Sequence, residues 1–455
     1  MTFSAGMQKN RLEWLVGGRG IFVVFCTYYI FATYLLPSIG SIERFSPAYM
    51  ALVIPGWIFV WLNRRVLLNA GWIPKLWWVF IAAVMLVALI QWSGSLAYNG
   101  LYIGLVAIAI VNSGGYLRTE ELNAIFLATI VGSVIVYYLG VTEYGFLPGQ
   151  ADATSCHHGL GFRVSLFRIP SESAALSFFV LLWNTFLPPQ GSRWRRWLAI
   201  TLAVYFLAFS GIRTAVIALL IVSPVLIYRL MPIRVRWARS AAALMIPAVV
   251  VMTSFYLLAA QGGGRFGSEF LASYLLRADS CEAVLSNPDD LGRIEIGATI
   301  PASRQLEEIL VEQGTSVNWL STTINRHCAG IYQLRLFLKH PFIGNKIVHP
   351  NDGDDPEIAV CTKSTMQRYC DACVLSTYWL SRGGGAGVAL IAIFCATLWI
   401  AVRKKSTFGI IALVAFGLIM QGWGVMFTPY NFTFYMLASL VPLIGISGSR
   451  EKRAG

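Results

Sequence analysis

Charged residues are scarce in this sequence of 455 residues. They make up 13% of the chain, about half of the share that is usual in soluble domains. Hydrophobic residues make up 56%, and a soluble fold cannot bury that much apolar surface. The composition therefore excludes an ordinary soluble domain and indicates a protein that crosses a membrane.

Several patterns are also missing. The apolar runs do not alternate as barrel strands must, and the chain has neither an internal repeat nor the paired, interrupted spans of inverted-repeat transporters. What is present is a series of apolar runs, most of them long enough to span a bilayer as a helix. We predict an all-α polytopic membrane protein with about twelve transmembrane helices, near residues 18–38, 46–62, 76–92, 97–112, 124–140, 171–187, 197–211, 214–228, 240–260, 384–402, 407–427 and 432–447.

The positive charge of the chain predicts its orientation. The net charge is +13, and 20 of the 35 Lys and Arg residues fall in loops on the side of the termini, together with only four acidic residues. Cytoplasmic loops are enriched in Lys and Arg, so both termini are predicted to be cytoplasmic. The excess charge is then an orientation signal, and nucleic acid is not expected as a partner.

The spans divide the chain into three parts. Residues 1–260 form an N-terminal transmembrane region of about nine helices, with a periplasmic loop near 141–170. Residues 261–382 form one large periplasmic loop, and residues 383–455 form about three helices and a short basic cytoplasmic tail. The first apolar run is as long as a span, so no cleavable signal peptide is expected.

The cysteines agree with this orientation. Cys26 and Cys395 fall inside spans, and an oxidising periplasm would permit up to three disulfides among the other six, in any of 15 connectivities. We expect the large loop to be disulfide-stapled. A metal or redox pair at Cys370 and Cys373 is the alternative, although a second CxxC is missing. The six candidates are Cys156, Cys281, Cys328, Cys361, Cys370 and Cys373.

Acids and bases are absent from the middle of the predicted spans. Ion paths and proton relays through a bilayer need such residues, so their absence argues against a proton-coupled pump. It does not exclude a lipid flippase.

Three basic motifs are predicted on the periplasmic side. The first is the turn Phe206–Ala215, which carries Arg213 between two spans. A guanidinium at head-group level is suited to bind a diphosphate through two parallel hydrogen bonds. An arginine that only anchors the helix end is the alternative.

The second motif, Gly161–Ala174, leads into the sixth span. Arg163 and Arg168 add two positive charges on the same side. Pro170 predicts the start of a helix, and Glu172 in its first turn either complements the helix dipole or takes part in the chemistry.

The third motif, Asn325–Gly344, lies in the large loop. Apolar residues at helical spacing predict an amphipathic helix that ends at Pro341 and Gly344. Arg335 and Lys339 share one face of it and form either a phosphate-binding strip or a solvated side.

Together these motifs resemble the O-antigen ligase and polymerase superfamily of bacterial inner membranes. The resemblance rests on the Ser210–Ala215 turn, on Arg163–Ala174, and on Asn325-Arg326 followed by His340–Gly344. Their order, the multi-span plan and the single large periplasmic loop belong to the same resemblance, which covers residues 160–390.

The resemblance implies a metal-independent glycosyltransferase of the GT-C type that uses no cofactor. Such enzymes transfer a glycan from an undecaprenyl-diphosphate donor to a hydroxyl of a glycan, of lipid A-core or of a protein at the periplasmic face. Arg213, with Arg163 or Arg168 and Arg326, would hold the diphosphate, because fixed guanidinium groups stabilise the charge that develops on it.

One part of the family pattern is missing. Ligases of this family carry a histidine followed by a small polar residue and, further on, a glycine that starts the next span. The corresponding stretch of this chain is Asp371–Val374, which precedes Gly383, and it contains no histidine. The general base stays open among His340, His349 and Asp371, and His340 alternatively caps its helix.

Two other polar clusters are interpreted as solvated turns rather than metal sites. The acidic run Asn351–Glu357 offers oxygen ligands but not the spacing of a calcium-binding loop. The pair His157-His158 is discounted as a metal site in the same way. No metal is expected.

We therefore expect an enzyme of the bacterial inner membrane with a periplasmic active face, and we favour a polymerase of lipid-linked O-antigen or a related surface polysaccharide. An O-antigen ligase is second and a protein O-oligosaccharyltransferase is third. A lipid-linked-sugar flippase is the alternative from another class, and it would line its spans with charged residues. The sugar, the linkage and the oligomeric state stay open.

Overall fold

The computed structural model divides the chain into two compact units, residues 1–222 with 389–455 and residues 223–388. The structure describes residues 18–39, 47–68, 71–139, 170–189, 193–209, 213–230, 238, 240–241, 245, 333–334, 337–344, 379–381, 383–421 and 432–454.

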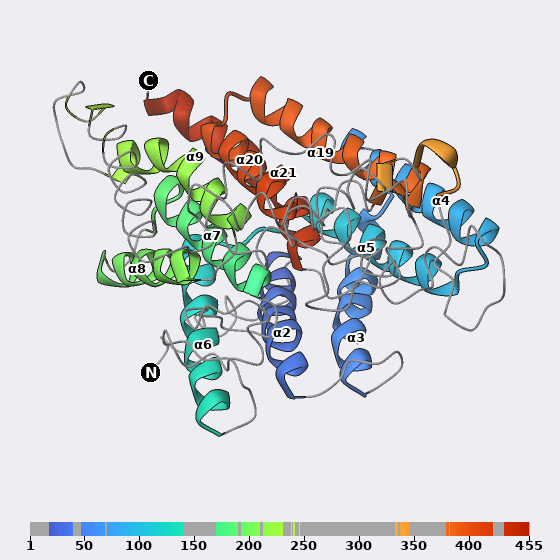
Figure 1. Cartoon of the computed structure of the whole chain (residues 1–455), viewed down its shortest axis with the longest axis horizontal. Helices are drawn as coiled ribbons and strands as arrows, with labels where there is room; N and C mark the ends of the chain where they lie inside the picture. The colour runs from blue at the N-terminus through green and yellow to red at the C-terminus, as the bar shows by residue number, and fades with distance from the viewer. Residues whose placement is uncertain are drawn as a thin grey trace, which may run out of the picture. The chain divides into compact units, whose positions relative to one another are not determined.

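Every regular element in these ranges is a helix (Figure 1), which confirms the predicted all-helical class. Three of the helices, α4, α5 and α19, are long and apolar enough to cross a membrane, and they indicate a membrane protein. The helices are α2 (Gly18–Ile39), α3 (Pro47–Leu62), the short η1 (Arg64–Val66), α4 (Trp72–Ile90), α5 (Gly94–Ser113), α6 (Thr119–Tyr138), α7 (Pro170–Phe186), α8 (Arg193–Phe209), α9 (Arg213–Leu230), α19 (Gly385–Arg403), α20 (Thr407–Gln421) and α21 (Phe432–Ala454).

The α-helices lie where the sequence predicts spans, but several extend further. α6 begins at Thr119 and α8 at Arg193, each a turn or so before the predicted span, and α21 continues to Ala454. Hydropathy marks the stretch that suits hydrocarbon, whereas helical hydrogen bonds continue into the polar interface. The predicted start of α7 at Pro170 is confirmed. Most of the span predicted near 240–260 lies outside the described residues.

α4 and α5 follow each other and pack together (Figure 1), and glycines of α5 lie at their contact. A Cβ added to Gly100 would lie 2.2 Å from Cγ1 of Val84, and one added to Gly104 would lie 2.4 Å from Cγ1 of Ile81. Small residues four apart let the backbones of membrane helices approach closely. The two glycines therefore set the distance between α4 and α5.

Polar side chains join α6 to α7 in the otherwise apolar interior. Asn123 and Asn184 are buried and exchange two amide hydrogen bonds, of 2.9 and 2.6 Å. Thr119 donates its hydroxyl to the carbonyl of Leu187. Hydrogen bonds between membrane helices contribute about 0.6 kcal/mol each on average, and these bonds fix the register of the two helices.

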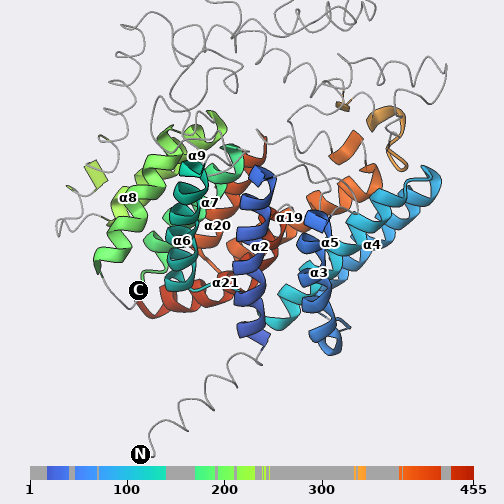
Figure 2. The ribbon, with the colours of Figure 1, turned by 90° about the horizontal axis from the view of Figure 1, so that it is seen from below.

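α2 lies in the middle of the first unit, between α6 on one side and α3 and α5 on the other (Figure 2). Phe25 of α2 stacks on Phe59 of α3, with ring centroids 4.9 Å apart, and meets Tyr435 of α21 edge to face at 5.8 Å. α21 also packs along α5. Helices from both ends of the chain thus share one core.

Several helix ends meet at one end of this unit. Trp183, near the end of α7, donates its indole N–H to the carbonyl of Leu117 just before α6, at 3.1 Å. The Trp183 ring meets Phe408 of α20 edge to face at 5.0 Å. Ser406, just before α20, is hydrogen bonded to Ser447 of α21 at 2.5 Å. The charge pattern of the sequence assigns these same helix ends to one side of the membrane.

Candidate functional site

The starts of α7 and α9 lie at the same end of the α7–α8 pair. Glu172 is in the first turn of α7, and Arg213 is the first residue of α9, soon after α8 ends. α7 and α8 pack along each other. They run antiparallel, because Arg196 at the start of α8 donates its Nε–H to the carbonyl of Asn184 near the end of α7, at 3.1 Å. The backbones of Glu172 and Arg213 are therefore at the end opposite to Arg196.

In the second unit, the turn that contains His340 closes a short helical stretch. The N–H of His340 donates to the carbonyl of Phe337 at 3.1 Å, and the carbonyl of His340 accepts from the N–H of Gly344 at 2.9 Å. Gly344 has a φ of 69°, which favours glycine. The helix end predicted at Pro341 and Gly344 is confirmed.

This turn packs on the glycine run at the start of α19. The N–H of Gly385 donates to the carbonyl of Phe342 at 3.0 Å. Gly384 has a φ of 47°, and a Cβ there would lie 2.5 Å from the nitrogen of Gly344, so a larger residue does not fit. The structure thus brings together the His340 turn and the glycine run, which are about forty residues apart in the sequence.

The side chains of Lys339 and His340 are exposed. Within the described part of the chain, no hydrogen bond engages the imidazole of His340. The backbone of His340 closes the helix, so the structure does not require the imidazole as a cap.

The other residues predicted for the site are placed less fully. For Arg213 and Glu172 only the backbone position is described. Arg163, Arg168, Arg326, Arg335, His349 and Asp371 lie outside the described residues, as do Asn351–Glu357, His157, His158 and the six cysteines Cys156, Cys281, Cys328, Cys361, Cys370 and Cys373.

Arginines at helix ends in the first unit lie over exposed tryptophan rings. Tryptophan and arginine gather at the level of lipid head groups, where the ring is amphipathic and the cation stays hydrated. These pairs are typical of a membrane interface. The distances from the guanidinium carbon to the ring centroid are 4.6 Å for Arg64 over Trp61, 5.6 Å for Arg195 over Trp194, 5.8 Å for Arg196 over Trp197 and 5.7 Å for Arg403 over Trp399.

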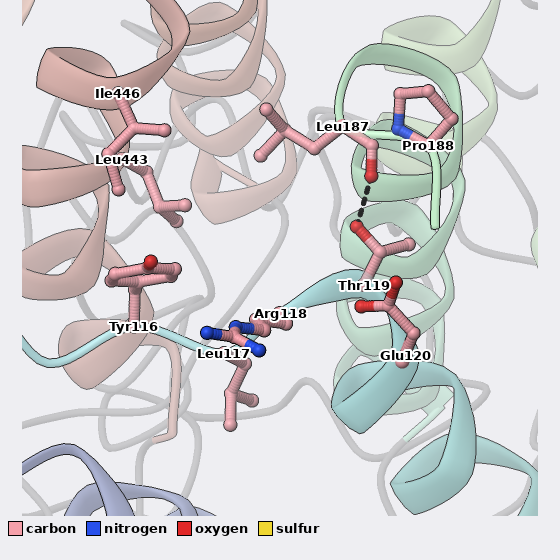
Figure 3. A pocket seen from close by; sticks show the side chains of 9 residues that line it. All are labelled: Tyr116, Leu117, Arg118, Thr119, Glu120, Leu187, Pro188, Leu443 and Ile446. Carbon is pink, nitrogen blue, oxygen red and sulfur yellow. Dashed lines mark hydrogen bonds between the residues drawn. The ribbon is translucent and has the colours of Figure 1, made fainter. Parts of the chain in front are cut away.

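A cavity of ≈ 250 Å³ lies where α6, the end of α7 and α21 meet (Figure 3). The segment just before α6 and its first turn form one side, the end of α7 forms a second, and α21 forms a third. The lining residues are Tyr116, Leu117, Arg118, Thr119, Glu120, Leu187, Pro188, Leu443 and Ile446.

Arg118 and Glu120 supply the charges of this cavity, and both are exposed. In Figure 3 the guanidinium of Arg118 extends toward Tyr116 and away from Glu120. It makes no ion pair or hydrogen bond with another residue in the described ranges. The backbone N–H of Arg118 donates to Oε2 of Glu121 at 2.7 Å, so Glu121 caps the start of α6 and Glu120 lines the cavity.

The predicted site residues that the structure describes are not among those that line the cavity. Along α7, Glu172 is about 22 Å from Leu187, at 1.5 Å per residue. Within the described ranges, no group of three His, Cys, Asp or Glu side chains is arranged to hold a metal ion. Sequence reasoning counted Arg118 and Glu120 only as loop charges. The polar residues of the turn before α6 can be seen in the sequence. That this turn and α21 line one cavity follows only from the packing of the helices.

The sequence matches no protein-family profile, and no curated protein matches it significantly.

Proposed function

We propose that this chain is a polytopic bacterial inner-membrane glycosyltransferase with about twelve spans and both termini in the cytoplasm. It transfers a glycan from an undecaprenyl-diphosphate donor to an acceptor hydroxyl at the periplasmic face. We favour a polymerase of surface-polysaccharide repeat units. An O-antigen ligase or a protein O-oligosaccharyltransferase uses the same donor chemistry with another acceptor.

The observation that carries this proposal is the arrangement of α7, α8 and α9. Arg213 and Glu172 belong to helix starts at the end of the α7–α8 pair opposite to Arg196. The basic turn at Arg193–Arg196 marks the cytoplasmic side by the positive-inside rule. By the same rule, the helix start that carries Arg213 belongs to the periplasmic side, where a lipid-linked diphosphate presents its charge.

The packing of the His340 turn supports the proposal independently. The turn is fixed against the glycine run by the hydrogen bond from Gly385 to Phe342 and by the close approach at Gly384. An exposed imidazole on a fixed backbone is suited to accept a proton. His340 is therefore our first choice among the candidate bases, ahead of His349 and Asp371.

The proposed reaction needs a base and fixed positive charges. The acceptor hydroxyl attacks the anomeric carbon of the donor sugar, the bond from that carbon to the phosphate oxygen breaks, and undecaprenyl diphosphate leaves. The base takes the hydroxyl proton. The guanidinium of Arg213, with Arg163 or Arg168 and Arg326, stabilises the charge that develops on the diphosphate, so no metal ion is needed for that role.

Arginine variants of the purified protein test this role. We expect Arg213→Ala to lower kcat/KM for transfer from an undecaprenyl-diphosphate donor by about a hundredfold or more, as loss of a fixed donor to a developing anion does. Arg213→Lys keeps the charge but loses the two parallel hydrogen bonds, and we expect an intermediate loss.

Arg229→Ala is the matched control, because Arg229 lies in the last turn of the same helix. It should transfer glycan at the wild-type rate. Full activity of Arg213→Ala would refute the proposed diphosphate site.

A further inference from the structure

We propose that the turn around His340 is an anchor on the membrane surface, where the apolar side chains of Leu334, Leu338, Phe342 and Ile343 contact lipid. The partner of this surface is the interfacial layer of the bilayer around the start of α19. The proposal rests on the packing of the turn within the second unit and does not depend on glycosyl transfer, so either proposal can fail without the other.

The apolar side chains of this stretch are exposed. Leu338 and Phe342 are 68% and 81% exposed, and Leu334 and Ile343 are exposed as well, whereas Gln333 is buried. A surface helix of a soluble domain shows the opposite pattern, with its apolar side buried and its polar side in water. Several exposed apolar side chains in one short stretch mark a surface that binds a protein or a membrane.

The length of α19 sets the depth of this surface. α19 is apolar enough to cross a membrane, and its 19 residues span about 28 Å at 1.5 Å per residue. This length is close to the hydrocarbon thickness of roughly 30 Å. At the end of α19, Arg403 lies over Trp399, a pair that is typical of head-group depth. The start of α19 at Gly385 therefore reaches the opposite boundary of the hydrocarbon.

The His340 turn is fixed at that boundary. The N–H of Gly385 donates to the carbonyl of Phe342 at 3.0 Å, and the close approach at Gly384 leaves no room for a larger residue. Val388, in the first turn of α19, is already exposed in the stretch that suits hydrocarbon, and it lies about 4.5 Å along the axis from Gly385. Phe342 is thus at the level where acyl chains begin, which favours lipid over a soluble partner.

The spacing of the apolar residues suits a segment that lies flat on the membrane. Leu334 and Leu338 are four residues apart, so helical spacing puts them on one face, and Phe342 continues this row into the turn. Lys339 is exposed next to Leu338, and a lysine at an interface extends its ammonium toward the head groups. Interfacial helices bury such an apolar face about 5–10 Å into the boundary between head groups and acyl chains.

Site-specific photocrosslinking of the full-length protein in phospholipid vesicles tests the proposal. A phenylalanine that carries a diazirine replaces Phe342 or, in a second protein, Leu338. The carbene formed by light inserts into its neighbour, and mass spectrometry distinguishes a lipid adduct, a water adduct and a cross-link within the chain. We expect lipid adducts to dominate at both positions.

Three positions serve as controls. The same group in place of Val388, which is exposed on the spanning helix, should give lipid adducts. In place of Trp379, which is buried, it should give cross-links within the chain. In place of Lys339, which is exposed on the neighbouring face, it should give mainly the water adduct.

A second measurement needs no substitution. A phospholipid with a diazirine near the glycerol end of its acyl chain should label the peptide of the wild-type protein that contains Leu338 and Phe342, and this result decides if a substituted protein fails to fold. Mainly water adducts or mainly cross-links to another segment at Phe342 would overturn the proposal, as would an unlabelled wild-type peptide. Equal lipid yields at Phe342 and Lys339 would overturn the one-sided contact.

Discussion

Replacing Gly100 with alanine tests the packing of α4 against α5. The new Cβ would lie 2.2 Å from Cγ1 of Val84 and 2.9 Å from its Cβ, whereas unstrained contacts between carbon atoms are about 3.5–4.0 Å. Val84 is fully buried, and a β-branched side chain in a helix keeps essentially one rotamer. Because Val84 cannot turn away, the two helices must separate.

The expected cost follows from two opposing effects. Overpacking a tight interface costs about 1–3 kcal/mol, and the higher helix propensity of alanine returns up to about 1 kcal/mol. Gly445→Ala is the matched control, because Gly445 lies inside α21 with no atom within 4 Å of an added Cβ. We expect Gly100→Ala to destabilise the protein by about 1–2 kcal/mol and Gly445→Ala to be neutral or stabilising.

The assay is the free energy of unfolding of purified protein in mixed micelles, followed by the loss of helical circular dichroism. Val84→Ala in the Gly100→Ala background removes the overlapping methyl groups, so the double mutant should show a favourable coupling of about 1 kcal/mol or more. Equal stability of the two alanine variants, or no coupling with Val84→Ala, would refute the reasoning.

Two further predictions concern the interior and the cysteines. Asn184→Ala removes both bonds to Asn123 and leaves a buried amide without its partner, so we expect a loss of about 1–3 kcal/mol in the free energy of unfolding. A double-mutant cycle with Asn123→Ala should give a coupling near 1 kcal/mol, and zero coupling would contradict the pair. Cys26 and Cys395 are free thiols, and the disulfides predicted from the sequence engage the other six cysteines. Thiol labelling of unreduced, denatured protein should therefore modify Cys26 and Cys395 alone. Labelling of all eight cysteines would refute the stapled loop.

The positions of the helices could be predicted because each helix is visible in the sequence as its own apolar run, without knowledge of its neighbours. Pro170 gave the start of α7, since proline is favoured in a first helical turn. The first turns of α6 and α8, which carry Thr119 and Arg193, could not be predicted from hydropathy, because their polar side chains lie beyond the apolar run. Hydropathy alone therefore gives the apolar span and leaves the true helix end undecided.

The contacts between helices could not be predicted in the same way. Lipid is as apolar as leucine, so small residues and hydrogen bonds select the partners of membrane helices. Gly100 and Gly104 are small residues four apart, a spacing that indicates a helix contact, whereas nothing in the sequence marks Val84 as the residue that Gly100 contacts. The Asn123–Asn184 pair joins residues far apart in the sequence, and neither residue alone indicates the other.

The same distinction between local features and contacts of distant segments applies to the candidate site. The end of the short helix at Pro341 and Gly344 was predicted from the residue types and is confirmed. The packing of Gly384 against that turn was not predicted, because it depends on a close approach between segments distant in the chain. The cavity at Arg118 was missed for the same reason, since α21 supplies one of its sides.

The central claim is that this chain assembles a surface glycan from a lipid-linked donor, and the glycan profile of a deletion strain of the native host tests it most directly. Gel electrophoresis of the surface lipopolysaccharide should show loss of the long ladder, with core plus one repeat unit remaining. Bare core would assign the chain to ligation instead of polymerisation. An unchanged ladder would contradict both.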